Sequence, residues 1–412
     1  MVSPFMSDTD KLAAVRVALP SLGAAIQMNT GSVGPMPAEV AAVMSELSEY
    51  ERTIGRSQFD YYLEGLDRMN EARAGVAAVL GASLGSVALT HATTDGMNHA
   101  IWALDWKAGD VAVTSTQEHP GGVGALYALR DRLGIEVRFA DIGDGSDDEV
   151  TMAALDRAIV PGTRLVSISH VLWSTGAVLP IARIAELAHD RGAVIAIDGA
   201  QAAGAIPVAV ADLGVDSYAI PAQKWLLGPD GMGALWVDPD ALDRLRPSFA
   251  GHYALEASDS RGVATWHGDA RRFEGTGFHR PSIAGFARSV SWLSMYVGLD
   301  FVHGRGARLA RQAADGLAEI EGIELLTPRH QMGTLVTFRI RGWSAQAGLD
   351  ELTLRTSVIA RTIVSLDALR LSLGFFNTDD ELERVLDCVR LLATHGPESL
   401  PPRKVLPIFG EA

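Results

Sequence analysis

The stretches Ala193-Val-Ile-Ala-Ile-Asp-Gly-Ala-Gln201 and Ser217-Tyr-Ala-Ile-Pro-Ala-Gln-Lys224 decide the fold. Residues 193–197 are short, apolar and rich in β-branched side chains, which predicts a buried strand. That strand ends on a carboxylate, Asp198. Residues 217–220 predict the next strand, and Lys224 lies just beyond it. An acid and an amine therefore stand at two strand ends, the edge at which α/β sheets bind ligands.

Asp198 and Lys224 each have a simpler interpretation when taken alone. Asp198 fits the cap of a following helix, and Lys224 fits an ordinary surface lysine. Apolar and aromatic neighbours argue against a surface position for the lysine, because the chain reads Ala222-Gln-Lys-Trp-Leu-Leu-Gly228. Desolvation there lowers the pKa of a lysine and favours the nucleophilic amine. A lysine and a carboxylate held together suit pyridoxal 5′-phosphate (PLP), which needs a Schiff-base lysine and an acid against its pyridine nitrogen.

Length and composition narrow the class of protein. The chain has 412 residues, of which 48% are hydrophobic, and 42 glycines, which fits a globular α/β protein of two domains. A net charge of −15 argues against nucleic-acid binding. The first residues lack the basic start and apolar stretch expected of a signal peptide, and no apolar run is long enough to span a bilayer. The single cysteine, Cys388, excludes an intramolecular disulfide and a cysteine-based metal cluster. We expect a soluble, cytoplasmic protein with no metal, nucleic-acid or membrane partner.

Strand and helix patterns alternate from 86 to 220, which predicts a mostly parallel sheet covered on both faces. A further strand at 233–237 is expected to be antiparallel. Periodicity fails over 249–281, an aromatic-rich irregular segment of the kind that is usually functional. An α+β pattern follows, with helical residues 282–320 broken near Gly298. We therefore predict a large domain (26–280) and a small domain built from 1–25 and 281–412.

Polar loops follow several predicted strands. Thr93 and Thr94 precede a helix expected at 96–105, where hydroxyls and free N–H groups form an anion site; a plain N-cap explains them equally well. His119 lies past the strand at 111–114, and Trp173 past the strand at 164–169. Asn29 opens a Gly/Pro-rich loop, which lets backbone approach a ligand closely.

Two arginines of the last region are interpreted differently. Arg361 is assigned to the solvated surface, as most arginines are. Arg370 lies within the apolar strand pattern of 369–373, where an unpaired guanidinium is costly to bury. A carboxylate ligand would satisfy Arg370 through a bidentate pair.

Taken in order, these motifs resemble the class V aminotransferase family. The matching residues are Thr93-Thr94, His119, Asp198-Gly-Ala-Gln201, Lys224, Arg272-Phe-Glu-Gly-Thr276 and Arg370. The family consists of fold-type I PLP-dependent enzymes and includes cysteine desulfurases, selenocysteine lyases and isopenicillin N epimerase-like proteins. The resemblance covers residues 28 to 395. It implies an α/β fold with a mostly parallel seven-stranded sheet and a smaller α+β C-terminal domain.

The resemblance also implies site roles. Three catalytic residues are implied: Lys224 forms the Schiff base and moves the proton at Cα, Asp198 pairs with the pyridinium nitrogen, and His119 stacks on the ring. The other implied cofactor contacts are Thr93, Thr94 and Gln223 at the phosphate, Gln201 at the ring hydroxyl, and Thr276 donated across a homodimer interface. Arg370 is implied to bind the α-carboxylate of an amino-acid substrate, and Asn29 and Trp173 are further expected substrate contacts.

The sequence departs from the desulfurase pattern between positions 361 and 370. Desulfurases carry a nucleophilic cysteine there, on a loop. Here residues 362–369 contain no cysteine and leave little room for a loop, and Cys388 is expected to pack within the last helix. A persulfide-forming desulfurase is therefore excluded. Gln223 and Trp173 also replace a histidine and an asparagine of that branch.

These residues predict a PLP enzyme that acts on an amino acid through an external aldimine and a Cα carbanion. β-Elimination from a cysteine S-conjugate, as in a C–S lyase of secondary metabolism, is the favoured reaction. Transamination and epimerisation use the same intermediates and stay open. A non-catalytic PLP-fold binding protein is the alternative from another class. A nicotinamide dehydrogenase is disfavoured because Gly228-Pro-Asp-Gly-Met-Gly233 precedes a strand instead of linking a strand to a helix.

Overall fold

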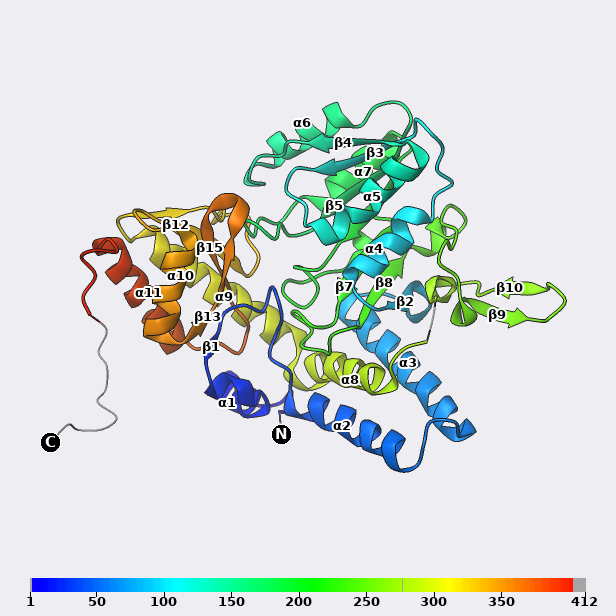
Figure 1. Ribbon diagram of the computed structural model, residues 1–412, viewed down its shortest axis with the longest axis horizontal. Helices are drawn as coiled ribbons and strands as arrows, with labels where there is room; N and C mark the ends of the chain where they lie inside the picture. The colour runs from blue at the N-terminus through cyan, green and yellow to red at the C-terminus, as the bar shows by residue number, and fades with distance from the viewer. Residues whose placement is uncertain (1, 276, 403–412) are drawn as a thin grey trace.

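A large twisted sheet and a smaller antiparallel sheet organise the chain, as Figure 1 shows. The computed structural model describes residues 2–275 and 277–402. Helices cover both sheets, and a narrow hairpin extends from the large one. The fold is the α/β architecture that the sequence predicts.

The large sheet has seven strands and is mostly parallel. Its spatial order is β2 (Val87–Thr90), β8 (Gly233–Val237), β7 (Ser217–Pro221), β6 (Val194–Asp198), β5 (Thr163–Ser169), β3 (Val111–Ser115) and β4 (Glu136–Ala140). Only β8 runs antiparallel to its neighbours, which confirms the expectation for that strand. Because β5, β6 and β7 are parallel, their carboxyl ends lie at one edge. Asp198 is the last residue of β6.

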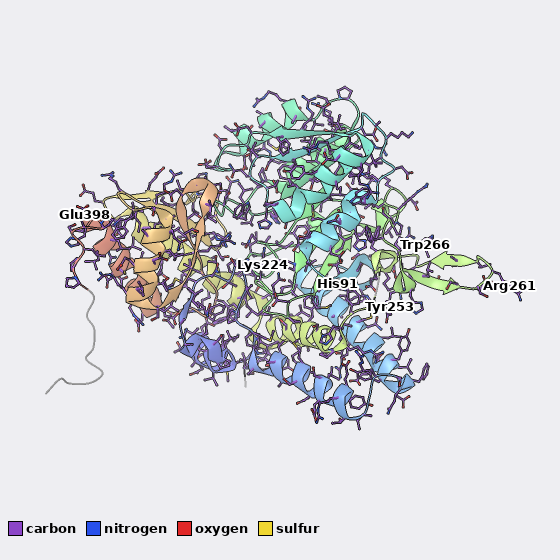
Figure 2. All side chains as sticks on the ribbon, viewed as in Figure 1. His91, Lys224, Tyr253, Arg261, Trp266 and Glu398 are labelled. Carbon is purple, nitrogen blue, oxygen red and sulfur yellow. The ribbon has the colours of Figure 1, made fainter. Side chains whose placement is uncertain are left out.

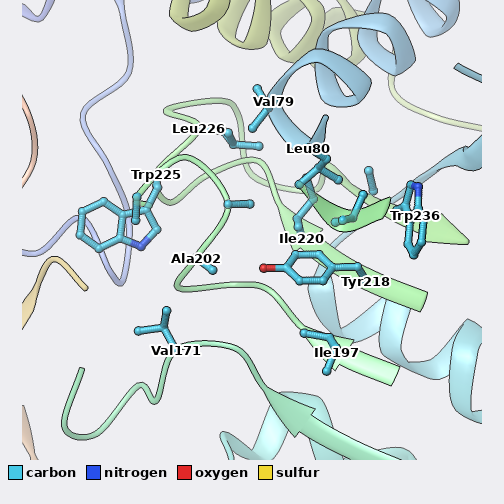
Figure 3. Packing of buried hydrophobic residues seen from close by; sticks show 14 of the residues in the cluster. Val79, Leu80, Val171, Ile197, Ala202, Tyr218, Ile220, Trp225, Leu226 and Trp236 are labelled. Carbon is cyan, nitrogen blue, oxygen red and sulfur yellow. The ribbon is translucent and has the colours of Figure 1, made fainter. Parts of the chain in front are cut away.

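Side-chain alternation along the buried strands supplies two hydrophobic cores, one on each face of the sheet. In β6, Ile195 and Ile197 join one core, whereas Val194 and Ala196 join the other. The first core includes side chains of α3 (Phe59–Leu80), α6 (Asp148–Ala158) and α7 (Ile181–Asp190), and the second includes those of α4 (Thr93–Trp102) and α5 (Pro120–Leu133). Figure 3 shows Tyr218 and Ile220 of β7 in the first core, near Leu80 of α3.

The smaller sheet is antiparallel and lies towards the C-terminus. Its order is β11 (Ile323–Leu325), β12 (Leu335–Ile340), β15 (Ala368–Ser372) and β14 (Arg361–Ile363). It shares a core with α9 (Leu299–Ala318), α10 (Ala345–Thr356) and α11 (Asp379–Thr394). Near it, β1 (Ile26–Gln27) pairs in parallel with β13 (Val358–Ile359), which brings the N-terminal segment to this part of the fold.

Three further helices lie outside these groups. They are α1 (Asp8–Ala18), α2 (Ala38–Thr53) and α8 (Arg280–Ser291). Ser7 caps α1 by accepting a hydrogen bond from the Asp10 N–H. α8 packs on α2 and α3 and continues into a π-helical segment (Trp292–Val297). Gly298, at φ 88°, then separates it from α9, which is the expected break. The domain limits near residue 280 stay a prediction.

The segment 249–281 is more regular than the sequence suggests. It contains a two-stranded hairpin, β9 (Leu255–Ser258) and β10 (Ala264–Trp266), that projects from the large sheet. Both strands are short and largely exposed, so they carry no hydrophobic alternation by which to recognise them. Among the described residues, no helix combines the length and apolar character needed to cross a bilayer.

Candidate active site

A cavity of about 240 Å³ opens at the carboxyl ends of the central strands, and most of the predicted site residues line it. Those that do are Thr93, Thr94, His119, Trp173, Asp198, Gln201, Gln223, Lys224 and Arg370. They come from separate stretches of the chain between residues 93 and 370. The cavity also takes in Ser32, Ser169 and Arg361, to which the sequence assigned no role. Thr276 lies outside the described residues.

Asp198 presents one free carboxylate oxygen to the cavity. Its Oδ1 accepts a hydrogen bond from the N–H of Ala200 (2.9 Å), and no described residue donates to Oδ2. No α-helix begins at the turn after Asp198, so the helix-cap interpretation does not hold. A Cβ added to Gly122 would lie 2.8 Å from Oδ2, so only glycine at that position leaves the carboxylate unobstructed.

Lys224 lies at the cavity on the turn after β7 and is only partly exposed. Burial lowers the pKa of its amine to about 8, against the opposing effect of the Asp198 carboxylate. The guanidinium groups of Arg370 and Arg361 lower that pKa further. A sizeable fraction of the amine is therefore neutral near physiological pH, the form that acts as a nucleophile or a base.

The paired threonines lie inside the first turn of α4, which begins three residues earlier than the sequence predicted. The N-cap position is Ala92, whose side chain caps nothing, so the plain N-cap interpretation of the threonines is wrong. Thr93 Oγ1 is buried without a hydrogen-bond partner. The carboxamide oxygen of Gln223 is likewise buried and unpaired, and its Nε2 donates to no described residue. The Thr93 hydroxyl and the Gln223 Nε2 group are hydrogen-bond donors without a described acceptor, and free donors at a helix N-terminus favour an anion.

His119 caps α5 and turns its ring into the cavity. Its Nδ1 accepts a hydrogen bond from the Gly121 N–H (3.1 Å), so Nδ1 is unprotonated. Burial lowers the pKa of the imidazole, and Lys224 adds to that effect. The ring meets the Trp173 ring edge to face, with centroids 5.3 Å apart. The site therefore offers a neutral aromatic surface next to the lysine.

Gln201 is fixed by two hydrogen bonds. Its Nε2 donates to the Gly31 carbonyl (2.8 Å), and its Oε1 accepts from the indole N–H of Trp225 (3.0 Å). Because an indole only donates, this contact sets the orientation of the amide. The second N–H of Nε2 remains available for a ligand.

Two arginines form one wall of the cavity. Arg370 is fully buried, and its Nη1 donates to the Trp173 carbonyl (2.7 Å) while Nε has no partner. Arg361 is its direct cross-strand neighbour and lies over the Trp173 ring at 5.9 Å. The surface assignment of Arg361 is therefore wrong, since the β14–β15 pairing turns it inwards. Neither arginine forms an ion pair with a described residue.

Asn29 does not reach the cavity. Its Oδ1 accepts the hydroxyl of Ser32 (2.8 Å), and Ser32 is the residue that lines the cavity and contacts the arginines. The direct substrate contact expected of Asn29 is therefore not supported, and its observed role is to orient Ser32. Segment 249–281 also contributes no described residue to this cavity, and Figure 2 shows Arg261 and Trp266 on a hairpin that points away from Lys224.

Cys388 packs in α11, as expected. Burial raises the pKa of its thiol to about 11, so it is a poor nucleophile. The connection between Arg361 and Arg370 is a short helical turn (Val364–Leu366) between two paired strands. It contains no cysteine.

Known proteins with similar sequences and structures match nearly the whole chain. The sequence profile of the Aminotransferase class-V family matches residues 30–385. A probable cysteine desulfurase of Methanothermobacter thermautotrophicus is 27% identical, over 79% of this chain and 80% of its own. The isopenicillin N epimerase of Amycolatopsis lactamdurans is 30% identical, over 90% and 96%.

Solved structures agree with the sequence comparison. The complex of the cystine C–S lyase C-DES with its product cysteine persulfide superposes with a TM-score of 0.84 at 25% identity, covering 92% of this chain and all (100%) of that one. A variant of the same lyase contains glycine covalently linked to the PLP cofactor. The chain therefore belongs to the aminotransferase class-V family, whose members are pyridoxal phosphate-dependent enzymes.

Proposed function

We propose that the protein is a C–S lyase that releases a thiol or persulfide from a cysteine S-conjugate by β-elimination. The observation that carries the proposal is a cavity with a lysine, a carboxylate and an arginine wall but without a cysteine between Arg361 and Arg370. Such a site can remove a Cα proton but has no thiolate to accept sulfur. Similarity to a cystine C–S lyase over almost the full length of both chains supports the same reaction class.

The unpaired polar groups of the cavity fit PLP. Thr93, Thr94 and Gln223 would hold the phosphate at the start of α4, Thr93 through its partnerless hydroxyl and Gln223 through Nε2. Asp198 Oδ2 would face the ring nitrogen and the free Gln201 N–H the ring hydroxyl. His119 would cover one ring face. When bound, PLP supplies the electron sink for the charge that develops at the substrate Cα.

Lys224 holds and moves the proton. In its neutral form the Nζ atom accepts a proton from the substrate Cα, and the resulting ammonium is available to protonate the departing sulfur. Its pKa of about 8 lets the amine exchange protons near physiological pH. The Asp198 carboxylate raises the pKa of Lys224 and so opposes the two arginines, which lower it. Both the neutral amine and the ammonium form of Lys224 are therefore accessible in the site.

The arginine wall orients the substrate. The unpaired Nε and the remaining N–H groups of Arg370 suit a planar carboxylate, and Arg361 adds a second positive charge beside it. Trp173 lies between His119 and Arg361 and bounds the space for the substrate side chain. A flat apolar wall there suits a bulky sulfur substituent better than an asparagine would.

Epimerisation of an amino acid is the second candidate. Its support is the match to isopenicillin N epimerase, which covers more of the chain than the desulfurase match does. That match also supports a place in secondary metabolism. We further propose that the protein is a cytoplasmic homodimer.

One set of assays on the PLP-loaded enzyme separates these reactions. With L-cystine and S-aryl-L-cysteines, β-elimination is expected to release pyruvate and ammonia in equal amounts together with the thiol or persulfide. Lys224→Ala is expected to abolish this release. Inversion of the substrate Cα without pyruvate would replace the lyase proposal with the epimerase. A strict need for a keto-acid acceptor would replace it with transamination.

A further inference from the structure

Glu118 is a titratable residue that the proposed reaction leaves unused, although it immediately precedes His119. Its side chain turns inwards from the end of β3. The Oε1 atom accepts the hydroxyl of Ser115 (2.5 Å), and Oε2 accepts the hydroxyl of Ser169 (2.5 Å). No described basic residue forms an ion pair with it. Glu118 is therefore a carboxylate beside the active-site cavity that is held by serine groups and not by a described cation.

The contacts of Glu118 join strand ends that build the site. Ser115 ends β3 and Ser169 ends β5. Ser169 is the register partner of Asp198 on β6, and both residues line the cavity. Glu118 therefore ties the end of β3 to the strand that flanks the Asp198 carboxylate. The Ser169 hydroxyl donates its proton to Glu118, so the Ser169 oxygen can act only as a hydrogen-bond acceptor towards the cavity.

The charge of Asp198 also acts on Glu118. Burial raises the pKa of Glu118 to about 7, the two serine hydroxyls oppose the shift, and the charge of Asp198 adds to it. Above neutral pH Glu118 therefore carries a second negative charge, close enough to Asp198 for the two groups to interact. That charge favours a protonated nitrogen in front of Asp198.

We propose that Glu118 is a positioning residue for Asp198. Through Ser169 it fixes the end of β5 beside Asp198, and its charge strengthens the negative potential that Oδ2 presents to the ring nitrogen of PLP. This inference rests on the cofactor contacts proposed above but not on which reaction the enzyme performs.

The test compares Glu118→Gln with the wild type. The amide is close in shape to the carboxylate and removes only the charge and part of the hydrogen bonding. We expect the dissociation constant of PLP to rise about tenfold, and the midpoint of the pH titration of the bound cofactor's visible absorbance to fall by about one unit. The thermal stability of the apoprotein is expected to stay unchanged. Glu136→Gln, an exposed residue on β4, is the matched control and should change none of these.

Two further variants keep the test decisive. Ser169→Ala should move the titration midpoint in the same direction by a smaller amount, because it cuts the link and leaves the charge. If Glu118→Gln lowers apoprotein stability but leaves the midpoint and PLP affinity unchanged, Glu118 is purely structural and the inference is wrong. If Asp198→Asn also leaves the titration midpoint and the PLP dissociation constant unchanged, the proposed cofactor contacts are wrong. If Asp198→Asn changes these two quantities and Glu118→Gln does not, the cofactor contacts stand and only the role of Glu118 is wrong.

Discussion

Arg361 and Arg370 stand directly opposite each other on antiparallel strands, and both guanidinium groups donate to the hydroxyl of Ser32. The distances are 3.2 Å from Arg361 and 3.5 Å from Arg370. Burial, and next the charge of Arg361, lower the pKa of Arg370 to about 9. Within residues 2–275 and 277–402 no carboxylate pairs with either arginine, and the Ser32 hydroxyl accepts from both, so the two positive charges form a candidate anion site.

Arg370→Ala should therefore weaken substrate binding strongly. A charge-assisted hydrogen bond contributes about 1.5–3 kcal/mol, so KM for an amino-acid substrate is expected to rise roughly 10- to 100-fold. Steady-state kinetics on the lyase substrates measure this. Arg339→Ala, on β12 of the same sheet, removes a guanidinium bound to Glu324 and should leave KM unchanged. An unchanged KM in Arg370→Ala would remove the arginine from the carboxylate site.

Lys224 is expected to capture PLP with a rate that rises with pH. Only the neutral amine attacks the cofactor aldehyde, so the rate for the apoprotein should increase through a midpoint near pH 8 and then level off. Stopped-flow absorbance follows the capture, and borohydride reduction should fix the label on Lys224. Arg370→Ala should shift this midpoint to higher pH, because it removes a charge that lowers the lysine pKa. Lys107→Ala, on an exposed turn, is the control.

The sequence located the residues whose signal is local. Asp198 ends an apolar run and Lys224 follows the next, so strand patterns alone bring both to one edge of the sheet. Arg370 was recognisable because a charge inside an apolar strand needs a partner. The Thr93–Thr94 pair was recognised as a candidate anion site from the sequence. The start of α4 was predicted too late, because the first turn of this helix is polar and lies outside the apolar periodicity.

Residues whose role depends on long-range register could not be found in this way. Arg361 looks like any solvated arginine until β14 pairs with β15. Glu118 gains its role from Ser169, which is 51 residues away and on a neighbouring strand. Asn29 shows the reverse case, because the loop folds so that Ser32, and not Asn29, contacts the arginines. Only the tertiary fold decides these contacts.

Glu274 is predicted to be essential for stability. It is buried, accepts two hydrogen bonds from Arg73 (2.8 and 2.6 Å), and also accepts the N–H of Leu89 (2.8 Å). Glu274→Ala leaves a buried guanidinium unpaired, so the free energy of unfolding should fall by about 3–5 kcal/mol. Chemical denaturation of the apoprotein measures the change. Glu49→Ala breaks the exposed pair with Arg52 and should have no measurable effect, and a comparable loss in both variants would contradict the prediction.

His170 should make the fold sensitive to acid. It is buried with its Nδ1 2.8 Å from the Tyr218 hydroxyl, and burial lowers its pKa to about 4 from an ordinary 6.5. Between pH 6.5 and pH 4 His170 is protonated in the unfolded chain but neutral in the folded chain. The free energy of unfolding is therefore unaffected by His170 above pH 6.5 and falls as the pH drops towards 4. The loss of unfolding free energy should reach about 2 kcal/mol at pH 5 and about 3 kcal/mol below pH 4.

The variant His170→Asn tests this prediction, because it removes the titrating group and keeps a polar side chain near Tyr218. Chemical denaturation at pH 7 and at pH 5 should show a smaller loss of stability in this variant than in the wild type. His252→Asn, at an exposed histidine, should behave like the wild type. Equal pH dependence in His170→Asn and the wild type would assign the acid sensitivity to other groups.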